Sequence, residues 1–169
     1  MQTVDPAAAQ PSIDAGPSGI GGWLVLPLIG LLISPIMIGW GTYHLVDVML
    51  APSWPELTTP GKPAYHPLYG ALIPVEIAVN AALAIFAVVL IVLFLKRRPT
   101  VPKLMIAFYL VNLAVVVVDT YAASFLPAFQ FDQTAVRDIA RALIAAVIWV
   151  PYFMLSKRVR NTFTAYPRA

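Results

Sequence analysis

Several charged side chains interrupt the apolar stretches of this chain and are expected at similar depths in a bilayer. Glu76, Asp119 and Arg141 form the predicted cluster, with Asp47 and Arg137 at its rim. Ionisable groups within a membrane span are costly and usually face other protein groups or a water-filled cavity. Carboxylates and guanidinium groups placed there can pair with one another, bind a polar solute or exchange protons.

Two asparagines extend this cluster along the same helix faces. Asn80 follows Glu76 by one helical turn, and Asn112 precedes Asp119 by about two turns. The spacing predicts a polar strip that continues toward the bilayer midplane. Such a strip would line a blind cavity that opens to the outside.

Three interpretations of the cluster stay open at this point. In the first, which the sequence favours, paired charges clamp the helices in a fixed order. In the second, the carboxylates form a solute-binding or proton-coupled site, because intramembrane ionisable residues are functional candidates by default. In the third, the cluster contacts a partner subunit.

Four apolar stretches position these residues. They cover approximately 22–49, 70–95, 103–123 and 135–155. A hydrocarbon core of about 30 Å needs about 20 helical residues to cross it, and each stretch is at least that long. With 60% hydrophobic and 11% charged residues, the chain is predicted to be an all-α integral membrane protein, a four-helix bundle.

The segments outside the spans define the expected domain organisation. Residues 1–20 are predicted to be a disordered tail, because a composition with two aspartates and three prolines cannot build a packed core. Residues 21–156 are predicted to form the transmembrane domain. The external loop 51–69 is rich in proline and is expected to be stiff and without helix. Residues 157–169 form a basic tail.

Lysine and arginine gather on one side of the predicted bundle. The loop between the second and third spans contains Lys96, Arg97 and Arg98, with Lys103 at its far edge. The C-terminal tail contains Lys157, Arg158, Arg160 and Arg168. Positive residues favour the cytoplasmic side, so both termini are predicted to be cytoplasmic. These basic ends are expected to contact anionic lipid headgroups rather than nucleic acid.

Other site chemistry finds little support in the sequence. There is no cysteine, and His44 and His66 lack the spacing of a metal or haem site. No phosphate-binding glycine loop or serine nucleophile elbow is present. We therefore expect no metal, no cofactor and no enzymatic activity.

Four segments resemble a known family. They are Ile20-Gly-Gly-Trp-Leu, Pro102-Lys103-Leu-Met, Asp119 in the third span, and the closing run from Arg141 to Phe163. In these the chain resembles the domain of unknown function 2569 family of bacterial four-span membrane proteins, over about residues 20–163. The closing run is the most specific part. The resemblance implies a multi-pass inner-membrane protein and transfers no catalytic residue.

Two functions from different classes follow. The first is a non-enzymatic accessory or interaction protein with a buried charge cluster near the outer face, acting on a partner membrane protein or as a homo-oligomer. The alternative is a small oligomeric transporter or solute- or proton-binding protein that uses Glu76, Asp119 and Arg141. A cluster open to water favours the second function, and a dry, fully paired cluster favours the first.

Overall fold

The described part of the chain is helical throughout, apart from its connecting segments. The structure, a computed structural model, describes residues 16–127 and 133–164. Its elements are η2 (Gly22–Leu24), α1 (Val25–Leu50), α2 (Trp54–Thr58), α3 (Tyr69–Leu95), α4 (Val101–Ala123), α5 (Gln133–Leu155) and α6 (Lys157–Thr162). Four helices are long and apolar enough to cross a membrane, η2 and α1 counting as one. The predicted all-α class with four candidate spans is confirmed.

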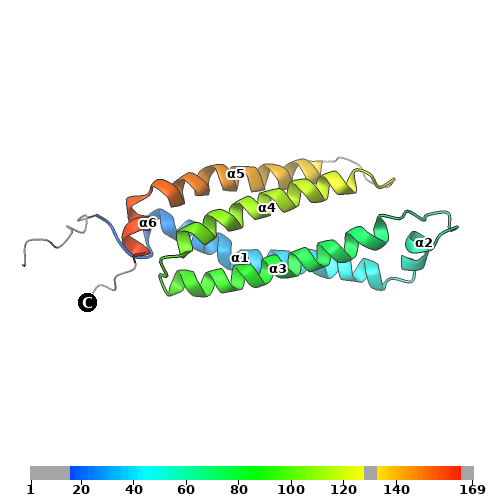
Figure 1. Ribbon diagram of the computed structural model, residues 1–169, viewed down its shortest axis with the longest axis horizontal. Helices are drawn as coiled ribbons and strands as arrows, with labels where there is room; N and C mark the ends of the chain where they lie inside the picture. The colour runs from blue at the N-terminus through cyan, green and yellow to red at the C-terminus, as the bar shows by residue number, and fades with distance from the viewer. Residues whose placement is uncertain (1–15, 128–132, 165–169) are drawn as a thin grey trace, which may run out of the picture.

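The four long helices form two pairs. α3 packs mainly along α1, and α5 packs mainly along α4. Figure 1 shows the two pairs meeting at the end of the bundle where α6 lies and separating toward the end where α2 lies. We call the first the closed end, made of η2, the α3–α4 connection and α6. We call the second the open end, made of α2 and the adjoining ends of the long helices.

The hydrophobic core lies at the closed end. Phe94 at the end of α3, Val101 at the start of α4 and Val159 in α6 are fully buried. The rings of Phe94 and Phe163 meet edge to face, with centroids 5.1 Å apart. The same core also contains the buried residues Leu24, Leu31, Ala87, Leu90, Met105, Phe108 and Phe153. Close packing of these side chains joins both helix pairs where they converge.

α6 covers the closed end and contacts the segment that precedes α1. Ser156 caps α6, its Oγ accepting a hydrogen bond from the Val159 N–H at 3.4 Å. Thr162 Oγ1 donates to the Gly19 carbonyl at 3.2 Å. The first part of the predicted basic tail is therefore a packed helix, because Val159 and Phe163 carry its apolar face. The predicted tail 1–20 lies outside the described residues as far as residue 15.

Two glycines allow the Arg158 side chain to approach the backbone. Gly22 has φ +54, a conformation that side chains rarely adopt. A Cβ on Gly21 would lie 3.1 Å from Arg158 Nη1, and one on Gly22 would lie 3.4 Å from Arg158 Cζ. The opening glycine segment and the closing basic run, far apart in the sequence, thus lie in contact.

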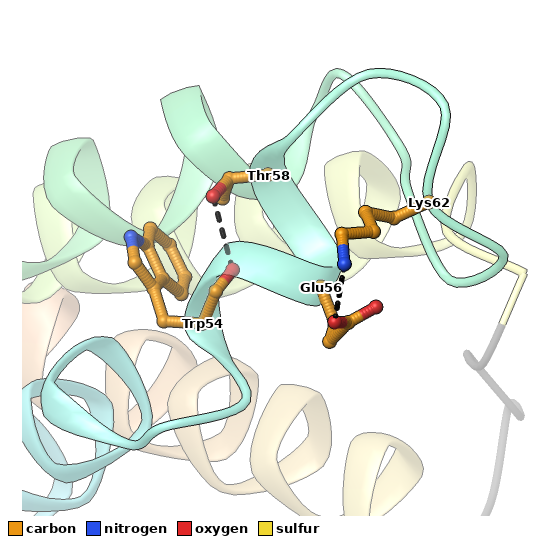
Figure 2. A network of polar contacts seen from close by, with 4 residues as sticks. All are labelled: Trp54, Glu56, Thr58 and Lys62. Carbon is orange, nitrogen blue, oxygen red and sulfur yellow. Dashed lines mark hydrogen bonds and ion pairs between the residues drawn. The ribbon is translucent and has the colours of Figure 1, made fainter.

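The proline-rich connection at the open end contains a short helix, so the prediction of a loop without helix is wrong. α2 carries Pro55 in its first turn, where the missing N–H costs nothing and the fixed φ suits a helix. Figure 2 shows its stabilising contacts: Thr58 Oγ1 donates to the Trp54 carbonyl at 3.0 Å, and Lys62 Nζ pairs with Glu56 Oε1 at 2.9 Å.

Candidate functional site

A cleft of about 600 Å³ lies between the two helix pairs, lined by side chains from α1, α3, α4 and α5. Its polar lining includes Ser34, Glu76, Asn80, Asn112, Asp119, Thr120, Asp138 and Arg141. Five of these residues belong to the predicted cluster or to its asparagine strip. The structure therefore brings Glu76, Asp119, Arg141, Asn80 and Asn112 together around one cavity. Whether they bind a ligand stays a prediction.

The cluster is not buried, and this part of the prediction is wrong. Glu76 and Asp119 are half-buried and Arg141 is exposed. Across the described residues, neither of the two carboxylates forms an ion pair. Arg141 Nη1 instead lies 3.7 Å from Asp138 Oδ1 on its own helix, with side chains 70% and 52% exposed. The helix pairs separate at this level, so Asp138, one turn away, is the nearer partner.

The two residues predicted at the rim do not line the cleft. Asp47, near the end of α1, and Arg137, in the second turn of α5, are both exposed. The cleft lining on α5 instead follows Ala135, Asp138, Ala142 and Ala145. Arg137 is not among these lining residues, and α1 contributes to the cleft only between Leu26 and Ile38.

Several lining residues were not predicted from the sequence, among them Asp138, Tyr109 and Trp149. Asp138 precedes Arg141 by three residues and Tyr109 precedes Asn112 by three, so both share a helix face with a predicted residue. This three-residue spacing was the sequence signal that could have identified Asp138 and Tyr109. Trp149 lines the cleft with Phe108 and Tyr109 at the side nearer the core.

The polar and apolar parts of the cleft are separated along its length. Glu76 lies seven residues into α3, about 10 Å from the open end, and Asp119 lies four residues, about 6 Å, from the end of α4. Phe108 and Trp149 lie farther toward the closed end. Arg141 pairs with Asp138, so Glu76 and Asp119 are the acidic side chains of the polar part that pair with no basic side chain in the described chain.

A second, smaller hollow lies on the other side of the same two carboxylates. It is a groove of about 280 Å³ between α3 and α4. Glu76, Val115 and Asp119 line both the groove and the cleft. The rest of the groove is lined by the aliphatic residues Leu72, Val75, Val79, Val111, Ala114, Val118 and Ala122.

The cleft lacks the side chains of a metal centre. Within residues 16–127 and 133–164, no three His, Asp or Glu side chains are placed to hold a metal ion. The lining also contains no histidine. Its available chemistry is hydrogen bonding, charge and aromatic contact.

Comparison with known proteins gives two matches. A family model described as "Protein of unknown function (DUF2569)" matches residues 17–164. The chain is also 35% identical, over 150 residues, to the inner membrane protein YdgK of Escherichia coli (strain K12), an overlap of 87% of this chain and 94% of that protein. No solved structure matches the chain.

Proposed function

Because this chain belongs to the DUF2569 family, whose description states no function, we propose its role from the central cleft. The chain is a non-enzymatic, multi-pass inner-membrane protein that binds a positively charged small molecule between its helix pairs. Glu76 and Asp119 are the groups that bind the charge. The inner-membrane location rests on the similarity to YdgK.

One observation carries this proposal. Two carboxylates from adjoining helices line a cleft of about 600 Å³, and neither is paired with a cation within the described chain. Charged side chains at membrane depth are costly unless a partner or water compensates them. A ligand with a positive charge would supply that partner.

The same observation favours solute binding over the accessory role. A clamp would need Arg141 to bridge helices, and Arg141 contacts Asp138 on its own helix. Asn80, Asn112 and Thr120 add polar groups to the cleft. The Thr120 hydroxyl already donates to the Val116 carbonyl at 2.8 Å, so its oxygen is presented as an acceptor.

We also propose that the closed end faces the cytoplasm. Lys96, Arg97, Arg98 and Lys103 are exposed there, and so are Lys157 and Arg160 of α6. This concentration of positive charge fits the positive-inside rule and contact with anionic headgroups. The cleft then widens toward the periplasmic side. A reporter fused after Ala169 that is active only in the cytoplasm tests the orientation, and activity of a periplasmic reporter there would contradict it.

The binding proposal is tested by calorimetric titration of butylammonium into the protein held in lipid nanodiscs. Hydrogen bonds to charged groups contribute about 1.5–3 kcal/mol, so Glu76→Gln and Asp119→Asn should each weaken binding at least tenfold. Asp47→Asn is the matched control, because Asp47 is exposed and does not line the cleft. Equal binding of butanoate, or no loss in the Glu76 and Asp119 variants, would contradict the proposal.

A further inference from the structure

The groove between α3 and α4 exposes the carboxylates of Glu76 and Asp119 on a second side. Glu76 and Asp119 face the central cleft on one side and this groove on the other. Apart from them, the groove is lined by aliphatic side chains alone. The carboxylates therefore lie where a polar cavity and an apolar groove adjoin.

The groove lies at the depth of the hydrocarbon layer. Along α3 its lining runs from Leu72 to Val79, and along α4 from Ala122 back to Val111. These segments extend about 10 and 16 Å from near the open end. Val75, Val111 and Val118 are 59%, 45% and 64% exposed, so this face has no protein covering in the described chain and would meet lipid.

We propose that the cation is lipophilic and reaches Glu76 and Asp119 from the bilayer through this groove, an inference that rests on the proposed function. The occupant is a single-chain amphiphile with a positively charged nitrogen. Its nitrogen lies between the carboxylates of Glu76 and Asp119, and its apolar chain lies along the valines of α3 and α4. The charge and the apolar lining of the groove complement the two halves of such a molecule.

The groove is favoured as the route for a physical reason. An amphiphile dissolved in the membrane already holds its chain at this depth, so it needs to move only laterally for its nitrogen to reach the carboxylates. Transfer of each methylene group from water into the bilayer is favourable by about 0.8 kcal/mol. Each methylene therefore raises the partition coefficient of the amphiphile by a factor of about four. A ten-carbon chain is therefore concentrated in the bilayer far above its level in water.

The test compares two amines in nanodiscs, decylammonium and butylammonium, with decyl sulfate as the anionic counterpart. Ala114→Phe places a ring in the groove at a position that does not itself line the cleft. Ala78→Phe is the matched control, since Ala78 is exposed on α3 and lines neither hollow. We expect Ala114→Phe to weaken decylammonium binding at least tenfold and to leave butylammonium binding within twofold of wild type.

The outcomes separate this inference from the proposed function. If Ala114→Phe and Ala78→Phe bind decylammonium equally while Glu76→Gln still abolishes butylammonium binding, the lateral route is wrong and the cation site stands. If neither amine binds the wild-type protein, the lateral route and the cation site are both wrong. If decyl sulfate binds as tightly as decylammonium, the occupant is not selected by its charge. Should Ala114→Phe lose butylammonium binding as well, Val118→Phe, at an exposed groove position, repeats the comparison.

Discussion

The two ends of this bundle differ in what holds them together. At the closed end, side chains from every long helix and from α6 form one core, with Leu90, Phe94 and Val101 fully buried. At the open end the helix pairs separate, and half-buried carboxylates line a cleft and a groove. Tight packing is therefore concentrated at the closed end, and the two carboxylates that form no ion pair in the described chain lie toward the open end. A site can be left open because packing elsewhere holds the helices.

The largest expected effect comes from removing a ring at the closed end. Phe94 is fully buried against Phe163, and Phe→Ala changes in such cores cost about 3–5 kcal/mol. Val118→Ala, at the exposed groove position, should cost less than about 1 kcal/mol. Unfolding titrations in mixed detergent micelles measure both variants. Equal losses would mean that the two ends contribute alike to stability.

The contact between the opening glycines and α6 gives the next effect. Gly22→Ala places a side chain at φ +54 and brings its Cβ within 3.4 Å of Arg158, which should cost about 1–2 kcal/mol. Gly39→Ala is the control, because a Cβ there meets nothing within 4 Å in the middle of α1. In a helix interior alanine is favoured over glycine by about 1 kcal/mol. In thermal unfolding, the melting temperature should fall for Gly22→Ala and rise for Gly39→Ala.

Neutralising the cleft should separate binding from stability. Glu76→Gln removes a carboxylate that forms no ion pair in the described chain, so the free energy of unfolding should change by less than about 1 kcal/mol. Butylammonium binding should nevertheless fall at least tenfold. A loss of several kcal/mol without altered binding would instead mean that Glu76 clamps the helices.

The smallest effect is expected at the tip of the open end. Lys62 and Glu56 pair at 2.9 Å, but both side chains are about half exposed, at 47% and 49%. Exposed pairs of this kind contribute about 0–1 kcal/mol. Lys62→Met should therefore change the melting temperature very little. A large shift would show that α2 closes the open end more tightly than its contacts indicate.

The sequence predicted the spans and the shared faces better than it predicted burial. Hydrophobic length alone locates the four long helices, and helical spacing places Asn80 with Glu76 and Asn112 with Asp119. Burial depends on the separation of the helix pairs, which is set by distant contacts such as Phe94 with Phe163. No local pattern around Arg141 reveals that separation, so its pairing with Asp138 was missed.

Two smaller differences have local causes. Proline was taken as evidence against helix in the external connection, yet Pro55 lies in a first turn, where a helix accepts it. The basic run after Leu155 was taken as a tail because its charges dominate. Val159 and Phe163, four residues apart, mark the apolar face that packs as α6 against the core.

The accessibility of the cleft can be measured directly, because the chain has no cysteine of its own. Ala142→Cys places a thiol in the cleft lining, and Ala146→Cys places one a single turn away, where Ala146 is 5% exposed. A positively charged methanethiosulfonate should modify Cys at position 142 rapidly and at position 146 slowly. Butylammonium should slow the first reaction. Equal rates at the two positions, or no protection by butylammonium, would contradict an open, cation-binding cleft.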